Sequence, residues 1–477
     1  MKLRIPSASL LTLSLLLSAC AVGPDYQRPS APVPTAYKEV GDWKVSEPKA
    51  VDADPIWWSI FNDPVLDALE KDVTLSNQTV AQAEAAWRAA VATADQANAS
   101  LFPTVGASAG VTRSGASTTT QGIRTSTIGN SYSAGGTLSW EIDVWGKLRR
   151  TLEAAQATAE SQNDQLAAAR LTAQSALASD YFALRGADEL KRLLDATVVA
   201  YERSLKITQN QYKSGTAAKS DVDQALTQLE STRSLAIAVV STRAQLEHAM
   251  AVLLGKAPAQ FSVAPIPGLA DAPVSPVTLP SALLERRPDI AAAERSMASA
   301  NAQIGVAIAA YFPDLTFDAS FSRTGETFDK LLRAGNNVWS FGPSLSETVI
   351  DWGARDAGVA GARATYDGQV AAYRQTVLTA FQQVEDDMIS LTQLASQAEV
   401  EDRAVASATE AERLITNQYR AGTVAYTSVV TAQAAALSAR QSALTIHQNR
   451  LTTTVALLQA MGGGWKAPVL TSSTASP

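Results

Sequence analysis

Side chains that bind metals or carry out redox chemistry are nearly missing from this chain. Its 477 residues include two histidines and one cysteine, which leaves few ligands for a transition metal and no second thiol for a disulfide. Aromatic residues supply only 6% of the sequence, and the formal net charge of −7 lacks the basic excess that is typical of nucleic-acid-binding proteins. These shortages argue against an enzyme, and we expect no metal and no resident cofactor.

Proline is absent from two long stretches, between Thr104 and Ala257 and between Ser344 and Ala467. Because proline breaks helices, both stretches predict long helices, and abundant alanine suits helices that pack closely. Prolines gather instead before and between these stretches. The sequence therefore divides into a signal peptide at 1–19, an extended leader at 20–64, a first lobe at 65–257, a proline-rich connector at 258–288, a second lobe at 289–465 and a tail at 466–477.

The two lobes repeat the same short motifs. Asn210–Thr216 reads NQYKSGT and Asn417–Thr423 reads NQYRAGT, a spacing of about 200 residues that indicates a tandem duplication. Two further pairs recur in the same order: Trp145-Gly146 with Trp352-Gly353, and Phe102-Pro103 with Phe312-Pro313.

Each lobe reads as a helix, two strands, a very long helix, a turn and a second long helix. From Lys147 to Lys213 apolar residues recur every three or four positions, as they do in amphipathic helices. At 1.5 Å per residue this helix would be a rod of about 100 Å, far longer than one compact core needs. We predict long helices at 147–213 and 220–255 in the first lobe, and at 354–420 and 427–461 in the second.

Between the helices, apolar residues recur at every second position, for example from Val105 to Val111 and from Leu315 to Phe321. This alternation and the segment lengths are typical of outer-membrane barrel strands, although a soluble hairpin packed on helices would also fit. We predict strands within about 103–144 and about 313–350, with polar loops at Arg113–Asn130 and Gly325–Asn337.

Four strands cannot close a barrel, and an open sheet edge is not tolerated in lipid. If the strands enter a membrane, several copies must share the barrel. Two copies would give a barrel filled by side chains, whereas three copies give twelve strands and room for a conduit.

The N-terminus has a basic start at Lys2 and Arg4, a short apolar run, and then Leu17-Ser18-Ala19-Cys20. This pattern is a secretory signal, and its end resembles the lipobox of bacterial lipoproteins, in which the cysteine is lipidated. We expect a covalent lipid on Cys20; the alternative is an ordinary signal peptide with a chance cysteine. Ala21 after the cysteine resembles the outer-membrane address.

The two Gly-Thr motifs are predicted to form the tips of helix hairpins. Gly215 and Gly422 suit the left-handed conformation that ends a helix, and Ser220 with Asp223 approximates a capping box for the helix that follows. The tips are either simple turns or, with Thr216 and Thr423, a docking face at the far end of the long helices.

Longer segments resemble a known family. The segments are Cys20–Pro29, Trp57-Trp58, Phe61–Pro64 and Glu285–Ile290, together with the two tip motifs. They resemble the TolC/OprM-like outer-membrane factors, in the lipoprotein (NodT-type) branch that serves resistance-nodulation-division (RND) pumps, over essentially the whole chain.

This resemblance implies a mainly α-helical homotrimeric channel-tunnel with a membrane β-barrel portion. A 12-stranded β-barrel would continue into a long α-helical periplasmic barrel, with the leader and the connector in a mixed equatorial belt. It implies a non-enzymatic exit duct in the outer membrane for small molecules, with a periplasmic adaptor and an inner-membrane RND pump as partners. A protein-secretion duct of the same fold and a lipid-anchored periplasmic scaffold remain the alternatives.

The resemblance also implies a gate at the periplasmic mouth. By position its candidates are Tyr212, Asp221 and Asp223 in the first lobe, and Tyr419, Arg420, Tyr426 and Thr431 in the second. Family members often carry an acidic and a basic residue near Thr431 and Ala434, and this chain has neither. The gate would then be closed by tyrosine and threonine hydrogen bonds, or by Asp221 and Asp223 against Arg420.

Overall fold

The computed structural model describes residues 21–39, 56–120, 123–273, 286–331, 335 and 337–465. Cys20, the signal peptide, part of the connector and the tail lie outside this range. The chain forms two compact units. Unit 1 takes its residues from Met1–Ser30, Ala86–Gln162 and Ala292–Tyr373, and unit 2 from Ala31–Ala85, Asn163–Ala291 and Arg374–Pro477. Each unit combines segments of both lobes, so the lobes of the sequence are not the compact units of the structure.

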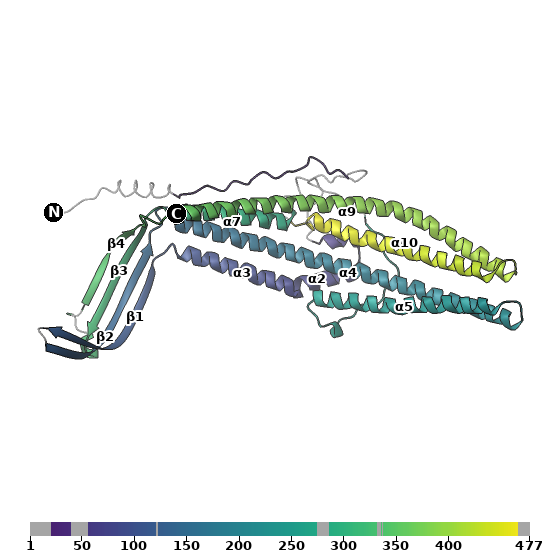
Figure 1. Cartoon of the computed structure of the whole chain (residues 1–477), viewed down its shortest axis with the longest axis horizontal. Coiled ribbons are helices and arrows are strands. Elements are labelled where there is room, and N and C mark those ends of the chain that lie inside the picture. Colours follow the sequence, from purple (N-terminus) through teal and green to yellow (C-terminus); the bar gives the residue numbers. More distant parts are fainter. Residues whose placement is uncertain are drawn as a thin grey trace. The chain divides into compact units, whose positions relative to one another are not determined.

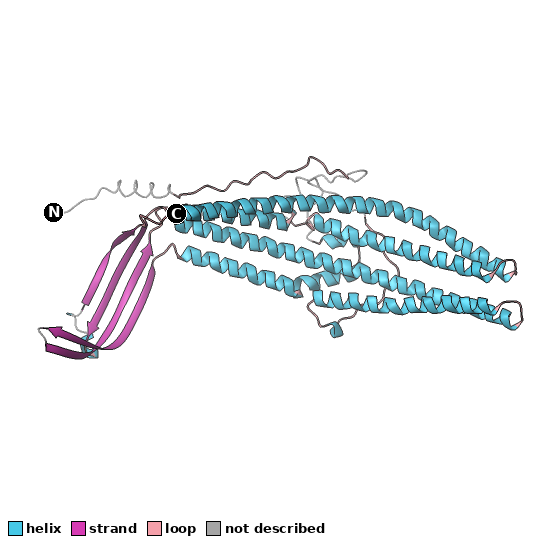
Figure 2. Ribbon diagram, viewed as in Figure 1, coloured by secondary structure: helices cyan, strands magenta, loops and turns pink. Residues whose placement is uncertain are grey.

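The four long helices occupy the segments expected of them (Figures 1 and 2). Helices α4 (Lys147–Lys213) and α9 (Ala354–Arg420) have the predicted bounds, and α5 (Lys219–Leu253) and α10 (Tyr426–Ala460) follow the tips. The shorter helical elements are η1 (Trp57–Phe61), α2 (Pro64–Ser76), α3 (Gln78–Ala99), η2 (Pro258–Gln260) and α7 (Pro288–Ala309). Across the described ranges, none of the helices has both the length and the apolarity to cross a bilayer.

The capping box predicted at Ser220 is wrong. Helix α5 begins at Lys219, and its N-cap is Ala218, which offers no side-chain hydrogen bond. Ala218 is extended, with φ −78° and ψ 155°, because the tip turn is short and leads straight into the next helix. Ser220 therefore lies inside the helix, two positions after the residue that occupies the N-cap.

Unit 1 contains an antiparallel sheet in the order β1-β2-β3-β4. Its strands are β1 (Thr104–Thr120), β2 (Ile123–Glu141), β3 (Asp314–Gly325) and β4 (Asn337–Ser346). The loop predicted at Arg113–Asn130 is wrong, because the ladder continues from the pair Arg113 and Asn130 to the pair Thr120 and Ile123. Its many threonines resemble a loop in composition, but threonine is β-branched and favours strands. The second loop does lie between β3 and β4 and includes the short helix α8 (Phe328–Leu331).

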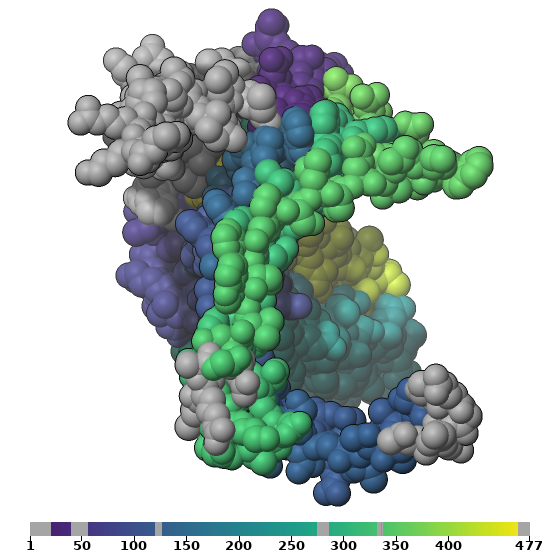
Figure 3. Space-filling model, turned by 90° about the vertical axis from the view of Figure 1, so that its left-hand side faces the viewer, coloured from purple at the N-terminus to yellow at the C-terminus, as the bar shows by residue number. Residues whose placement is uncertain are grey.

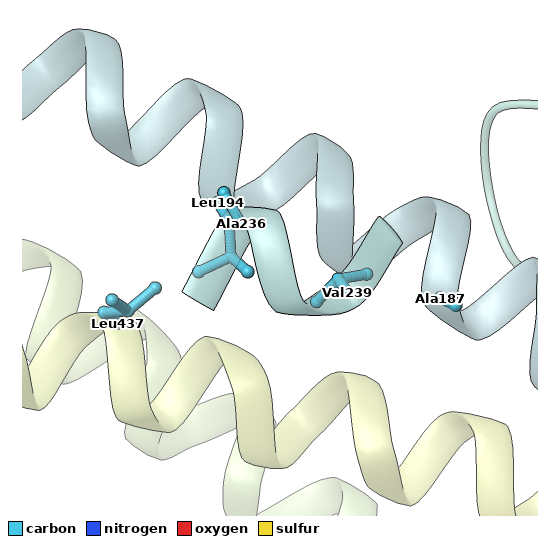
Figure 4. Packing of buried hydrophobic residues seen from close by; sticks show 5 residues of the cluster. All are labelled: Ala187, Leu194, Ala236, Val239 and Leu437. Atoms are coloured by element: carbon cyan, nitrogen blue, oxygen red, sulfur yellow. The ribbon is translucent and has the colours of Figure 1, made fainter. Parts of the chain in front are cut away.

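A cluster of apolar side chains joins three helices of unit 2 (Figure 4). Ala187 and Leu194 come from α4, Ala236 and Val239 from α5, and Leu437 from α10, and each is less than a tenth exposed. Small alanine side chains allow the helix backbones to approach one another. The core here is a seam between helices, as the alanine-rich sequence predicts.

The leader is fixed to unit 1 by the buried side chain of Arg150. Its guanidinium binds the Asp25 carboxylate at 2.8 Å and the Glu153 carboxylate at 2.7 Å, and it donates to the backbone carbonyl of Val22 at 3.3 Å. The amide of Val22 donates in turn to the carbonyl of Trp145 at 3.0 Å. The residues directly after Cys20 are therefore held against the start of α4.

In unit 2 the leader is fixed to α9. The Tyr37 ring packs edge-on against Phe381 with a centroid separation of 6.5 Å. The amides of Lys38 and Glu39 donate to the two carboxylate oxygens of Glu385, at 2.7 and 2.9 Å. Glu385 therefore anchors the leader rather than serving only as a solvated charge.

Candidate membrane sheet and helix tips

The strand register puts the apolar side chains of the sheet on one face. Val105 pairs with Leu138, Leu138 with Ala319, and Ala319 with Phe341, and residues paired across neighbouring strands share a face. The same face also carries Val111, Tyr132, Phe317, Phe321, Trp339 and Leu345. The period-two pattern of the sequence thus becomes one continuous apolar face.

Among the described residues, much of this apolar face is exposed, although Phe328 of α8 packs against Tyr132. Val105 is 78% exposed, Trp339 66% and Phe341 68%, and Figure 3 shows the blue β1–β2 and green β3–β4 hairpins at the front of the view. The opposite face is polar, with Ser139 donating to Asp318 at 2.7 Å. A soluble monomer rarely exposes so continuous an apolar surface, which marks a lipid or protein contact.

Strands β1 and β4 are the two edges of the sheet, and each pairs on one side only. Free edges present rows of unpaired amides and carbonyls. An apolar face can lie in a bilayer only if such edges are closed by other strands. The sheet is therefore a fragment of a larger wall.

The first tip is a Schellman turn at the end of α4. Gly215 has a φ of 77°, the left-handed conformation that glycine adopts without steric cost. The Thr216 amide donates to the Gln211 carbonyl at 2.8 Å, and its hydroxyl donates to the same oxygen at 3.0 Å. The amide of Gly215 donates to the Tyr212 carbonyl at 3.0 Å, which completes the motif.

The second tip repeats this geometry at the end of α9. Gly422 has a φ of 76°, and both the amide and the hydroxyl of Thr423 donate to the Gln418 carbonyl, at 3.0 and 2.9 Å. The repeated Gly-Thr pair thus has a structural reason in each lobe, since glycine permits the turn and threonine caps a carbonyl. Docking at the tips stays a prediction.

Two of the gate candidates tie the second hairpin to the first. Tyr426 is only 1% exposed, and its hydroxyl lies 3.1 Å from the Ser204 hydroxyl of α4. Tyr419 donates to the Gln211 side-chain carbonyl at 2.6 Å, and the two tyrosine rings pack edge to face at 5.1 Å. Burial raises the pKa of Tyr426, and the charge of Asp221 raises that pKa further.

The charged candidates have near partners in the chain. Asp223 pairs with Lys219 at 2.8 Å on the exposed surface of α5, and Arg420 donates to the Asn417 side chain at 3.4 Å. Across the described part of the chain, the structure contains no ion pair between Arg420 and either Asp221 or Asp223. Closure of the gate by Arg420 against Asp221 or Asp223 stays a prediction.

Tyr212 and Thr431 lie on the surface of the hairpins. Tyr212 is 47% exposed, and the Thr431 hydroxyl donates to the carbonyl of Thr427 in its own helix at 2.9 Å. The structure thus separates the buried Tyr426 and the half-buried Tyr419, which contact α4, from the other candidates, which lie partly or fully at the surface.

The sequence reading missed a buried carboxyl group in α2. Glu70 is fully buried, neither carboxyl oxygen has a hydrogen-bond partner within the described residues, and burial raises its pKa to about 9. A signal was present, because Leu66, Leu69 and Val73 place Glu70 on the apolar side of the helix at spacings of three and four.

A polar groove between α9 and α10 was also missed. It has a volume of about 690 Å³ and is lined mainly by glutamine, serine and threonine side chains, among them Gln393, Gln397, Gln441 and Thr445, together with Glu401. The corresponding seam between α4 and α5 holds the apolar cluster of Leu194 and Val239. The two lobes therefore differ in how tightly their long helices pack.

Comparison with known proteins identifies the class of channel. The family model described as outer membrane efflux protein matches residues 70–256 and 279–463, once in each lobe. The chain belongs to the outer membrane efflux protein family. It is a transport duct of the outer membrane and not an enzyme, as the sequence motifs predicted.

The chain is also similar to individual members over nearly its whole length. It is 29% identical over 460 residues to the probable efflux pump outer membrane protein TtgC of Pseudomonas putida, covering 96% of this chain and 95% of that protein. It is 30% identical over 467 residues to the probable outer membrane lipoprotein SilC of Salmonella typhimurium, covering 97% and 99%.

A solved structure extends this likeness to the fold. The outer-membrane channel OprN superposes with a TM-score of 0.86 at 27% identity, over 94% of this chain and 100% of that chain. The predicted family, the channel-tunnel fold and the role as the exit duct of an efflux system are confirmed by these matches.

Proposed function

We propose that three copies of this chain close into one outer-membrane duct, to which a periplasmic adaptor and an inner-membrane RND pump attach. The observation that carries the proposal is the four-stranded sheet, with one exposed apolar face and two free edges. Pairing of β1 in one copy with β4 in the next removes both edges, and three copies supply the twelve strands of an open barrel.

The helices of unit 2 support the same head-to-tail arrangement. Arg233 of α5 binds Glu202 of α4 at 2.6 Å, Tyr426 of α10 contacts Ser204 of α4, and Arg440 of α10 binds Glu412 of α9 at 3.1 Å. These contacts join the four helices within one chain, and α5 also packs on α10, since Ala236 and Val239 share a buried cluster with Leu437.

Helices α5 and α9 both carry exposed apolar side chains. On α9, Leu378, Ile389 and Val400 follow one another at intervals of about three helical turns, so they share a face. On α5, Ile237 is 73% exposed and Val240 52%. A face on α9 that meets a different face on α5 of the next copy is a heterologous contact, and such contacts give a closed ring when the rotation from copy to copy adds up to a full turn.

A lipid on Cys20 would anchor this duct a second time. Residues 22–25 are bound beside the start of α4, where Val22 donates to Trp145, and Trp145 follows the end of β2. The acyl chains of Cys20 would therefore enter the bilayer close to the sheet. The similarity to SilC, which is named an outer membrane lipoprotein, supports this assignment.

The hairpin tips are the proposed contact with the adaptor. Gly215-Thr216 and Gly422-Thr423 form two exposed turns of the same geometry, and a partner with repeated hairpins of its own could bind both. The contacts of Tyr419 and Tyr426 with α4 would keep each second hairpin against the first until the adaptor binds. The cargo would be small molecules, as for similar proteins that are named for toluene and antibiotic efflux pumps.

Planar-bilayer recording tests the duct. Purified protein should give discrete conductance steps that disappear after heating, as expected of a non-covalent oligomer. A periplasmic scaffold that never enters the bilayer would give no steps at any protein concentration. Deleting the chromosomal copy and measuring resistance to solvents, dyes and antibiotics then identifies the cargo class.

A further inference from the structure

An aromatic contact joins the two lobes at the point where the sheet meets the helices. Trp145, just after β2, stacks on Phe312, just before β3, with ring centroids 4.7 Å apart and planes inclined by 23°. The indole N–H of Trp145 also donates to the carbonyl of Pro313 at 2.9 Å. Both groups lie in unit 1, and together they fix the end of one strand pair to the beginning of the next.

The duplication supplies a second set of the same residues, and these are exposed. Trp352 follows β4 as Trp145 follows β2, and Phe102-Pro103 precedes β1 as Phe312-Pro313 precedes β3. Trp352 is 96% exposed and Phe102 is 62% exposed. They do not meet within the chain because β4 and β1 are the opposite edges of the sheet.

We propose that Trp352 of one copy stacks on Phe102 of the next copy and donates its indole N–H to the carbonyl of Pro103 there. The contact repeats between copies the contact that Trp145 makes within each copy. This inference rests on the proposed closure of β4 against β1 of a neighbouring copy, and it adds a specific lock on the helical side of that seam. A stacked pair of aromatic rings contributes stability beyond the burial of its apolar surface.

Backbone pairing beside the two tryptophans supports the same contact. The amide of Ile142 donates to the Leu315 carbonyl at 2.8 Å, which extends the β2–β3 pairing toward Trp145. The counterparts by repeat position are Val349 and Val105, which are 85% and 78% exposed. Backbone neighbours as well as the aromatic rings are therefore exposed at this end of β1 and β4 in the single chain.

The two turns differ in one respect. Trp352 has a φ of 55°, in the left-handed region that costs a non-glycine residue energy, whereas Trp145 does not have a positive φ. Docking on a neighbouring copy would bring the backbone of Trp352 toward the conformation of Trp145 and would relieve that strain.

Cysteine pairs and a short bis-maleimide test the contact in purified, lipidated protein. The double variant Trp352→Cys with Phe102→Cys should yield covalent species of two and three chains on denaturing gels. The two single variants, expressed together, should yield linked pairs of chains, and each alone should yield none, because the contact is head to tail. The matched control, Trp145→Cys with Phe312→Cys, should link within one chain and give no higher mass.

Light scattering on the same samples separates this inference from the proposed function. A trimer whose 145–312 pair reacts while its 352–102 pair does not would overturn the contact and leave the duct standing. A single-chain mass would overturn both. Because a cysteine variant can fail to fold, Trp352→Phe and Trp352→Ala provide a second measurement. The phenylalanine variant, which keeps the stack, should lower the temperature of trimer dissociation less than the alanine variant, and equal values for both variants and the wild type would contradict the contact.

Discussion

Glu70 carries a buried proton. It lies among Leu66, Leu69 and Val73 on the inner side of α2, and burial raises its pKa from 4.5 to about 9. Between these two pH values the folded chain keeps a proton that the unfolded chain releases. The free energy of unfolding therefore falls as the pH rises through this window, by up to about 1.4 kcal/mol per pH unit from this one group.

Replacing Glu70 by glutamine should remove this dependence. Glu70→Gln is expected to match the wild type near pH 5 and to unfold at a clearly higher temperature near pH 8, because glutamine has no proton to lose. Thermal unfolding in detergent from pH 5 to 8.5 measures the difference between the two proteins. A constant difference across that range would show that Glu70 is ionised in the fold.

Tyr426 is the buried residue that connects the second hairpin to α4. Tyr426→Phe removes only the hydroxyl that contacts Ser204, at a cost of about 1 kcal/mol. Tyr426→Ala also leaves a cavity, at a cost of about 3–5 kcal/mol, and should speed hydrogen exchange in the tip of α9 and α10. Tyr212→Phe is the matched control, because Tyr212 is exposed; if all three variants exchanged alike, the tyrosine pair would not hold the hairpins together.

At the scale of the elements, the turn after α4 depends on one glycine. Gly215 has a φ of 77° and open space around the position of a β-carbon, so Gly215→Ala pays only the backbone cost of about 1–2 kcal/mol. Gly361 lies inside α9 with equally open space, and Gly361→Ala should instead stabilise by up to about 1 kcal/mol. Thermal unfolding of both variants should give shifts of opposite sign, and shifts of the same sign would contradict the left-handed turn.

The leader is expected to depend on Arg150. Arg150→Ala removes the donor to the Val22 carbonyl, a charged hydrogen bond that contributes about 1.5–3 kcal/mol. It also removes the partner of Asp25, whose side chain is exposed, so that this pair adds about 1 kcal/mol at most. Limited proteolysis should then cleave residues 21–39 much faster than in the wild type. Arg149→Ala, which loses only its pairing with Asp143, should leave that rate unchanged, and equal rates for the two variants would show that Arg150 is not the anchor.

Helical elements were read from the sequence more reliably than their ends and turns. The bounds of α4 and α9 followed from apolar spacing between a Trp-Gly pair and a Gly-Thr pair. The capping box predicted at Ser220 was wrong because capping depends on the backbone path of the tip, which places Ala218 at the N-cap. The loop predicted at Arg113–Asn130 was wrong because small polar residues occur both in loops and in strands. Only pairing with the neighbouring strand distinguishes the two.

Contacts between distant segments were beyond the sequence reading for another reason. The resemblance names Tyr426 and Tyr419 as gate candidates by position, but their contacts with α4 depend on how the two hairpins pack. The pairing of Trp145 with Phe312 likewise becomes visible only when β2 and β3 are found side by side. The sequence repeat then identifies Trp352 and Phe102 as the equivalent residues, which do not meet within one chain.

At the scale of the whole molecule, the number of strands in the sheet is the main argument for assembly. Four strands with an exposed apolar face and free edges cannot persist alone in lipid, so assembly is a physical requirement of the fold. Because the two lobes are duplicates, the pairing of β4 with β1 of the next copy should resemble the pairing of β2 with β3 inside the chain. Head-to-tail closure is therefore the expected symmetry.

The mass of the purified protein in detergent tests this account most directly. Light scattering corrected for bound detergent should give three times the mass of one mature chain, from a full-length chain mass of 50.2 kDa, and heating should reduce it to one. A protein that is folded by circular dichroism yet has the mass of a single chain before heating would contradict the shared wall on which the duct depends.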